Sequence, residues 1–169
     1  MQHAIYQYAL DGRLFIAPIS IDKLHHILDV GTGTGIWVMD VADENSQAQV
    51  VSFDLSPIQP DTVPSKFLLD DCNSDWLFAE KFGLIHTRAM TPGIKDWSRY
   101  LQRAYDNLNP GACIELHEIP VPARCTEATS SPVPYFVEWS RLILEASSKV
   151  GLDVGVAEKL KELYRLLVL

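Results

Sequence analysis

Two kinds of apolar pattern alternate along the chain. Short, nearly continuous apolar runs predict buried strands, whereas longer segments with an apolar residue every three or four positions predict helices with one buried face. In one of these helices Asp96 is the expected N-cap and Asn109-Pro110-Gly111 the expected stop. The expected strands are residues 27–30, 49–53, 66–69, 83–87 and 113–119, and the expected helices are residues 3–10, 36–44, 96–108, 135–150 and 156–169.

The order of these elements predicts the fold. Strands that alternate with helices form a parallel sheet covered on both faces, because each crossover helix packs back onto the sheet. We therefore expect an α/β protein with a Rossmann-like, doubly wound, mostly parallel sheet. Its ligand site should lie at the carboxyl edge of the strands, beside the first strand.

The segment between the first expected strand and the next helix carries three glycines. It reads Asp29-Val30-Gly31-Thr32-Gly33-Thr34-Gly35, and such a turn lets a ligand lie against bare backbone. A dinucleotide fingerprint has the spacing G-x-G-x-x-G, so its third glycine would fall at Ile36. The third glycine stands one residue earlier, which disfavours an NAD site. The alternative to a ligand site is a glycine turn with only a structural role.

A second candidate ligand group, Asp54, follows the strand expected over residues 49–53. In nucleotide-binding α/β folds, a carboxylate about 20 residues beyond the glycines bonds the ribose hydroxyls. Asp54 meets this requirement, although Asp54-Leu55-Ser56-Pro57 also suits a helix N-cap or a turn. Together with the glycine turn, its position favours the ribose role.

The composition narrows the classes of partner. The 169 residues are one domain's worth, 47% of them are hydrophobic, and the net charge is −8. An acidic surface repels phosphate backbones, so nucleic acid is not an expected partner. Neither a membrane-spanning apolar stretch nor the basic start of a secretory leader is visible, so no membrane association is expected. Cys72, Cys113 and Cys125 lack metal-type spacing, which favours reduced thiols and a cytoplasmic or nuclear location.

Several motifs resemble those of one enzyme family. The D-x-G-x-G-x-G run at residues 29–35 resembles motif I of the class I S-adenosylmethionine-dependent methyltransferases. Residues 54–60 (Asp-Leu-Ser-Pro-Ile-Gln-Pro) and 94–97 (Ile-Lys-Asp-Trp) resemble segments of the LaeA-like fungal methyltransferases, and they are more specific than the glycine motif. Residues 3–19 and 85–90 are similar to that family too, so the resemblance covers nearly the whole chain. It implies a class I fold, S-adenosylmethionine as cofactor, and methyl transfer within fungal secondary metabolism or its regulation.

The resemblance also implies a role for each matching residue. Asp54 is expected to hold the ribose, Leu55 to pack on the adenine, and Asp71 and the backbone of Cys72 to bond the adenine edge. Arg88 is expected to reach the methionine carboxylate, with a solvated surface arginine as the alternative. For Asp71 and Cys72 the alternative is a turn after a short strand. The residues expected at the methionine end of the cofactor are Asp29, Gly31, Thr32, Gly33 and Gly35.

The expected organisation is one methyltransferase domain over residues 1–169. It comprises an N-terminal cap segment at 1–26, a cofactor-binding core at 27–119 and a helical part at 120–169. Gly83 stands where the family usually has an acid, and Gly111-Ala112 where it usually has Gly-Gly. The family usually has further strands, so we expect a sheet that lacks its last strands and leaves the fifth strand as an exposed edge. A protein partner or a second copy of the chain would cover that edge.

The candidate catalytic residues are His117 and Glu118, at the end of the fifth expected strand. Transfer from a sulfonium depends mainly on positioning, and an oxygen or nitrogen acceptor can also require a base. Side chains alternate along a strand, so at most one of the two faces the acceptor, which is a small molecule or a protein. His86 is a further candidate base, although a lone histidine within a strand is more often a core residue. Trp97 and Trp139 are expected in the core, with the lining of an acceptor pocket as the alternative. The alternative function is a degenerate, non-catalytic scaffold or a partner-dependent subunit.

Overall fold

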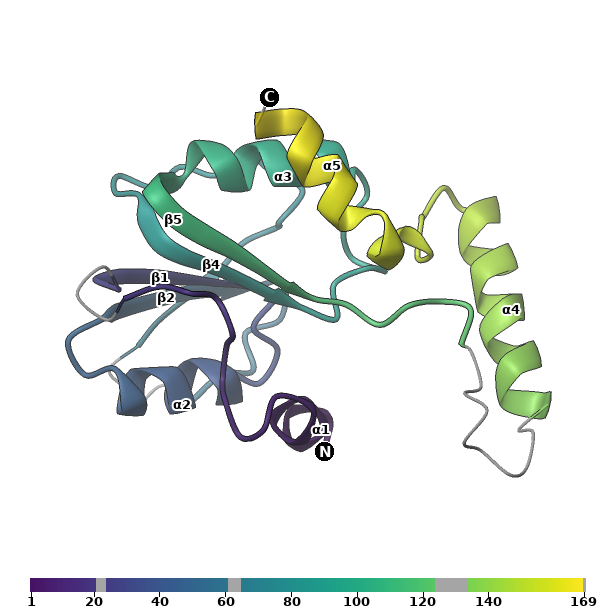
Figure 1. Cartoon of the computed structure of the whole chain (residues 1–169), viewed down its shortest axis with the longest axis horizontal. Helices are drawn as coiled ribbons and strands as arrows, with labels where there is room; N and C mark the ends of the chain where they lie inside the picture. Colours follow the sequence, from purple (N-terminus) through teal and green to yellow (C-terminus); the bar gives the residue numbers. More distant parts are fainter. Residues whose placement is uncertain (21–23, 61–64, 124–133, 169) are drawn as a thin grey trace. The chain divides into compact units, whose positions relative to one another are not determined.

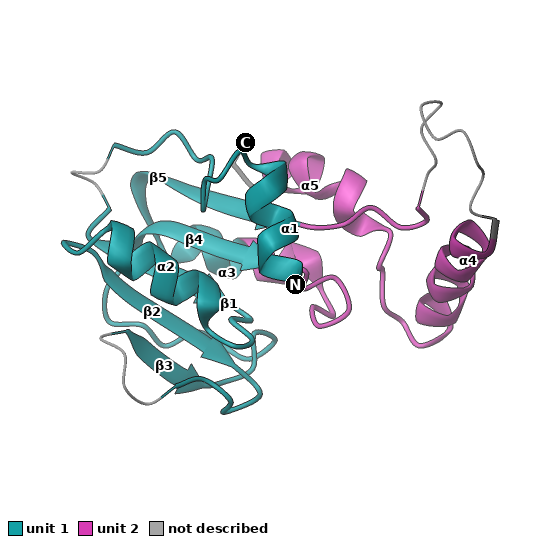
Figure 2. Ribbon diagram, turned by 90° about the horizontal axis from the view of Figure 1, so that it is seen from below, with its two compact units in different colours: residues 1–88, 102–117 teal, residues 89–101, 118–169 magenta. Residues whose placement is uncertain are grey.

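The computed structural model (Figure 1) describes residues 1–20, 24–60, 65–123 and 134–168. The chain divides into two compact units, shown in different colours in Figure 2. The first unit comprises residues 1–88 and 102–117, and the second comprises residues 89–101 and 118–169.

The first unit is built on a parallel sheet of five strands in the order β3-β2-β1-β4-β5. The carboxyl ends of parallel strands meet at one edge of the sheet. The order turns outward in both directions from β1, so the switch point lies between β1 and β4. The expected Rossmann-like α/β fold is therefore confirmed. The strands are β1 (His26–Val30), β2 (Gln49–Asp54), β3 (Lys66–Leu69), β4 (Phe82–Arg88) and β5 (Leu108–His117).

The core of the first unit lies between the sheet and α2 (Ile36–Glu44). Strands β1 and β4 are buried along almost their whole length, as expected for central strands of a parallel sheet. Trp37 of α2 is also buried, and its indole Nε1 donates to the carbonyl oxygen of Leu14 at 2.8 Å. Helix α1 (Gln2–Ala9) lies on the same side of the sheet as α2 (Figure 1).

The chain around β5 differs from the prediction. Helix α3 (Trp97–Asp106) ends before residue 108, and β5 begins at Leu108 instead of residue 113. The register with β4 shifts, because Phe82 pairs with Leu108 whereas Leu84 pairs with Cys113. The residues expected to form a turn make a bulge inside the strand, where Gly111 has a φ of 77°. The strand then ends at His117 instead of residue 119.

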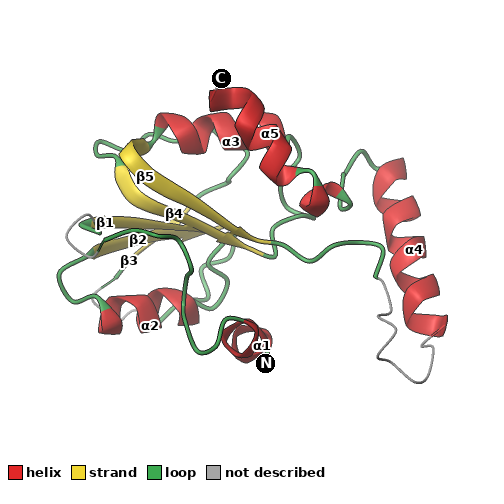
Figure 3. Ribbon diagram, viewed as in Figure 1, coloured by secondary structure: helices red, strands yellow, loops and turns green. Residues whose placement is uncertain are grey.

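The second unit contains the start of α3 and three further helical elements, drawn red in Figure 3. Asp96 caps α3 as predicted, since its Oδ1 accepts the backbone N–H of Arg99 at 3.0 Å. Trp97 is buried as expected, but the core prediction for Trp139 is wrong, because its side chain is 56% exposed and stacks on Phe136. No helix within the described ranges is long and apolar enough to span a membrane. The three elements are α4 (Pro134–Lys149), η2 (Val156–Glu158) and α5 (Leu160–Val168).

Candidate cofactor site

The glycine turn leaves β1 and enters α2 at the carboxyl edge of the sheet. Gly31, Gly33 and Gly35 have φ values of 73°, 58° and 78°, a region that favours glycine. A Cβ atom added at Gly33 would meet nothing within 4 Å, so bare backbone faces open space there. A Cβ at Gly35 would lie 2.8 Å from two ring atoms of Phe67. One glycine therefore leaves room for a ligand, whereas another is required by packing.

Asp54 lies at the tip of β2 and faces this turn. Its Oδ2 accepts the backbone N–H of Gly33 at 2.8 Å, and its Oδ1 accepts that of Ser56 at 2.9 Å. A carboxylate has about four acceptor positions, so lone pairs remain for hydroxyl donors. The side chain of Leu55 is 67% exposed and is open to stack on a planar ligand. The structure thus brings the predicted ribose residue, Asp54, against the glycine turn, and Leu55 follows it directly in the chain.

The residues after β3 form a tight turn beside the C-terminal half of α3. Oδ1 of Asp71 accepts both the backbone and the side-chain N–H of Asn73 at 2.9 Å. The carbonyl oxygen of Cys72 accepts from Arg103, which also donates to the carbonyl of Asn73 at 2.7 Å. Burial, followed by the nearby charge of Asp71, raises the pKa of the Cys72 thiol to about 11, so the thiol is protonated at neutral pH. Hydrogen bonds therefore hold the turn that carries Asp71 and Cys72, and their contact with adenine stays a prediction.

Asp29 is paired with His86, a candidate base that the sequence more readily assigned to the core. In the sheet register Asp29 lies opposite His86 of β4, and its Oδ1 is 2.7 Å from Nδ1 of that imidazole. The ring of Trp37 stacks on the ring of His86 with centroids 3.7 Å apart and planes inclined by 6°. Burial lowers the pKa of His86 despite the opposing effect of Asp29, so the imidazole is neutral at pH 7.

Arg88 closes β4 and is half-buried, so it is not a solvated surface arginine. Its Nη1 lies 3.2 Å from Nδ1 of His3, and its guanidinium carbon is 5.0 Å from the centroid of the Tyr6 ring. Nε2 of His3 in turn lies 2.8 Å from Oδ2 of Asp40 on α2. Burial lowers the pKa of Arg88, while the charge of Asp29 opposes this shift. These contacts tie helix α1 to the carboxyl edge of β4.

His117, one of the two catalytic candidates, belongs to a cluster on β5. Its Nε2 lies 2.6 Å from Oε1 of Glu115, but the angle between the two groups is not that of a hydrogen bond. The ring of His117 stacks on the ring of Tyr6. The carboxylate of Glu115 also accepts the backbone N–H groups of Ile16 and Ala17 at 2.6 to 3.0 Å. Burial raises the pKa of Glu115, but His117 and these N–H groups more than offset it, so the pKa lies below its ordinary value.

The other catalytic candidate, Glu118, lies in the second unit and holds the loop that follows β4. Its Oε1 accepts the backbone N–H of Met90 at 2.7 Å and its Oε2 that of Thr91 at 3.1 Å. Hydrogen bonds of this kind favour the charged form of a carboxylate and make it a weaker base. A catalytic role for Glu118 stays a prediction.

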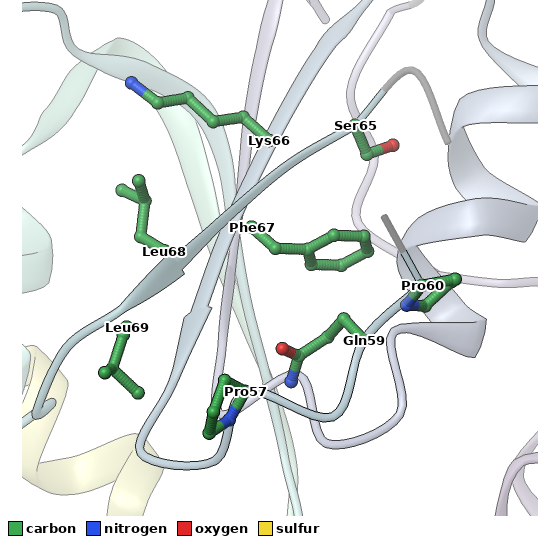
Figure 4. A pocket seen from close by; sticks show the side chains of 8 residues that line it. All are labelled: Pro57, Gln59, Pro60, Ser65, Lys66, Phe67, Leu68 and Leu69. Carbon is green, nitrogen blue, oxygen red and sulfur yellow. The ribbon is translucent and has the colours of Figure 1, made fainter. Parts of the chain in front are cut away.

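A hollow of about 410 Å³ lies beside β3 and the loop after β2. Figure 4 shows the side chains of Phe67, from β3, and Gln59, from the loop after β2, among its lining. Nε2 of Gln59 donates to the carbonyl oxygen of Gly33 at 2.6 Å, and the ring of Phe67 lies against Gly35. These two side chains therefore contact the glycine turn at Gly33 and Gly35. Gln59 belongs to the motif at residues 54–60, but neither glutamine nor phenylalanine has a characteristic ligand chemistry that would have predicted this role.

Two features of the turn fit a nucleoside cofactor with a charged amino-acid end. Oγ1 of Thr32 is buried and, among the described residues, has no hydrogen-bond partner, as expected for a group that awaits a ligand. Open space at Gly33 lies next to the carboxylate of Asp54. The carboxylate of Asp54, the exposed backbone at Gly33 and the unpaired hydroxyl group of Thr32 thus lie at one edge of the sheet.

The methyltransferase-domain family matches residues 1–155. Methyltransferase pytC of Aspergillus terreus is 34% identical over 165 residues, which cover 96% of this chain and 51% of pytC. Secondary metabolism regulator LAE1 of Cochliobolus heterostrophus is 31% identical over 168 residues, which cover 95% of this chain and 55% of LAE1. The chain therefore spans about half the length of these relatives.

A solved structure supports the fold. The Haemonchus contortus phosphoethanolamine N-methyltransferase 2, in complex with phosphomonomethylethanolamine and S-adenosylhomocysteine, superposes with a TM-score of 0.64. The match covers 96% of this chain and 36% of that one at 19% identity, so it bears on architecture alone. The architecture, the family match and the two relatives agree with the motif resemblance. The chain belongs to the methyltransferase-domain family and is a LaeA-like member of it.

Proposed function

We propose that this protein binds S-adenosylmethionine at the carboxyl edge of β1 and β2 and transfers its methyl group to an acceptor. The observation that carries the proposal is the contact between Asp54 and the backbone N–H of Gly33, beside open space at the glycine turn. This arrangement supplies ribose acceptors and bare backbone in one place. The relatives, a methyltransferase and a secondary-metabolism regulator, support a role in fungal secondary metabolism or in its regulation.

The roles proposed for the individual residues rest on the resemblance of their motifs to those of the family. Asp54 holds the ribose hydroxyls, Leu55 covers one face of the adenine, and Asp71 with the backbone of Cys72 meets its polar edge. Asp29 and Arg88 supply a negative and a positive group for the ammonium and carboxylate of the methionine part. The turn residues that line this part are Gly31, Thr32, Gly33 and Gly35.

The bound cofactor would supply a sulfonium, which releases its methyl group readily to a nucleophile. The contribution of the chain is then to hold the donor in a fixed geometry and to keep water out, since positioning carries most of the rate. His117 and Glu118 are the groups available for proton removal from an acceptor. Each is engaged in the structure, by Glu115 and by two backbone N–H groups respectively, so proton removal would require one of these contacts to loosen.

The acceptor is proposed to be a small molecule or a protein. A further protein, or a second copy of the chain, is proposed to cover β5, which pairs only with β4 among the described strands. The net charge of −8 favours an acceptor or partner without a phosphate backbone.

The proposal is tested by calorimetric titration of the protein with S-adenosylmethionine, S-adenosylhomocysteine and NADH. We expect the two sulfur ligands to bind and NADH not to bind. Asp54→Ala should weaken binding by about 1–3 kcal/mol through the loss of charge-assisted hydrogen bonds. Asp43→Ala is the matched control, because Asp43 is an exposed acid on α2. Binding of NADH without S-adenosylhomocysteine would overturn the proposal.

A further inference from the structure

The pairing of Asp29 with His86 fixes one side of a buried carboxylate. The register of β1 and β4 places the two residues opposite each other, and Oδ1 of Asp29 lies 2.7 Å from Nδ1 of His86. The two side chains are only 5% and 1% exposed. A buried carboxylate is costly unless hydrogen bonds satisfy it, so this contact determines how Asp29 is oriented.

The surroundings of His86 specify which of its ring nitrogens carries the proton. Within the described part of the chain, Nε2 of His86 is buried and has no hydrogen-bond partner. A proton on Nε2 would therefore be a buried, unsatisfied donor, whereas a proton on Nδ1 is donated to Asp29. The stacked ring of Trp37 prevents the imidazole from rotating out of this arrangement.

The charged and titratable groups around His86 come from three strands. Asp29 lies on β1, His117 approaches the ring edge from β5 with centroids 5.1 Å apart, and Arg88 lies two residues further along β4. Arg88 and His117 both disfavour a second positive charge at His86, as burial does. Only Asp29 favours it, and burial outweighs this effect, so the pKa of His86 is lowered and the imidazole stays neutral.

We propose that His86 is a positioning residue that presents the charged carboxylate of Asp29 to the ammonium group of the cofactor's methionine part. The inference rests on the proposed function and adds a residue that acts through Asp29. A neutral donor suits this role, because it orients the carboxylate without cancelling its charge. An imidazolium at the same place would form an ion pair and weaken the attraction for a cationic ligand.

The test separates the hydrogen bond from the packing of the ring. His86→Asn places an amide N–H close to the position of Nδ1 but removes the ring, whereas His86→Phe keeps a ring against Trp37 but removes the donor. His86→Gln moves the amide toward the position of Nε2. We would titrate the full chain and each variant with S-adenosylhomocysteine, and with 5′-deoxy-5′-methylthioadenosine, which lacks the amino-acid part.

We expect His86→Phe and His86→Gln to bind S-adenosylhomocysteine about ten- to a hundred-fold more weakly than the unchanged protein, the equivalent of one lost hydrogen bond to a charged group. His86→Asn should keep most of the affinity, because its amide supplies a donor close to the position of Nδ1. Affinity for methylthioadenosine should change by less than about two-fold in each variant, since that ligand lacks the ammonium group that the carboxylate of Asp29 would bind.

The outcomes distinguish the inference from the proposed function. Equal losses for both ligands, or a His86→Asn variant that binds as weakly as the Phe and Gln variants, would overturn the role of His86 alone. If His86→Phe does not fold, the Asn and Gln variants carry the comparison, because they differ in where the donor lies. Failure of the unchanged protein to bind either ligand would overturn the proposed function, and the inference with it.

Discussion

Substitution of Gly35 tests whether the glycine turn is fixed by packing as well as by ligand access. The φ of 78° at Gly35 costs an L-residue about 1–2 kcal/mol. A Cβ atom there would also lie 2.8 Å from the ring of Phe67, and overpacking of this kind costs about 1–3 kcal/mol. Gly35→Ala should therefore lower the free energy of unfolding by about 2–5 kcal/mol.

Gly33→Ala is the matched control. It has a φ of 58°, but nothing lies within 4 Å of the added Cβ. Its cost should be the backbone contribution alone, about 1–2 kcal/mol. Because the added methyl group occupies the open space assigned to the ligand, this variant should lose affinity for S-adenosylhomocysteine despite its milder effect on stability.

The assay is urea unfolding followed by tryptophan fluorescence, combined with calorimetric binding for each variant. Phe67→Leu in the Gly35→Ala background should recover part of the stability, because it removes the ring atoms that meet the new Cβ. Equal destabilisation by Gly33→Ala and Gly35→Ala would refute the role of packing at Gly35. Full binding by Gly33→Ala would refute the placement of the ligand.

Three further predictions concern the same unit. Glu115→Ala should lower the free energy of unfolding by about 1–3 kcal/mol in urea titrations, because the amides of Ile16 and Ala17 lose a charged acceptor. An unchanged urea midpoint would contradict this prediction. Burial places the pKa of His86 below its ordinary value of 6.5, so the unfolded chain binds the extra proton first. The contribution of His86 to stability should be fully present above that pH and be lost as the pH falls, with a further loss below about 4.5 from Glu115. His86→Phe should remove the first of these losses, and an unaltered pH profile of its thermal midpoint would show that His86 does not cause it. Leu55→Ala should weaken S-adenosylhomocysteine binding by about 1 kcal/mol in calorimetry. It should leave the thermal midpoint unchanged, because the side chain is 67% exposed. A lower thermal midpoint would show that Leu55 packs in the fold.

The strands, the glycine turn and the position of Asp54 followed from the sequence because their signals are local. Buried strands appear as apolar runs, and a strand, glycines and helix in succession specify one kind of edge. Asp54 could be placed beside the turn because the turn follows β1, Asp54 ends β2, and these neighbouring strands end at the same edge of the sheet. The structure brings them together through the contact of Asp54 with Gly33.

The contacts between distant strands could not be predicted in the same way. The pairing of Asp29 with His86 depends on the register of β1 against β4, which the apolar pattern of either strand leaves open. The sequence therefore presents His86 as a candidate base or a core residue, without indicating its partner. The sequence could have suggested the pair, because both residues precede the end of a central strand and hence approach the same edge.

Two local predictions failed for identifiable reasons. Asn109-Pro110-Gly111 is a strong turn signal, but a left-handed glycine also serves a bulge, and here the strand continues through it. Trp139 fits an apolar helix face, and that pattern predicts the helix without specifying what covers it. In the described residues this side chain remains 56% exposed on α4.

The most direct test of the cofactor site is a titration of the isotopically labelled protein with S-adenosylhomocysteine, followed through its backbone amide resonances by NMR. We expect the resonances of Gly31, Gly33, Leu55 and Cys72 to shift together with one dissociation constant, while that of Glu145 on α4 stays in place. Shifts confined to other parts of the chain, or none at saturating ligand, would contradict the placement of a cofactor site at the carboxyl edge of β1 and β2.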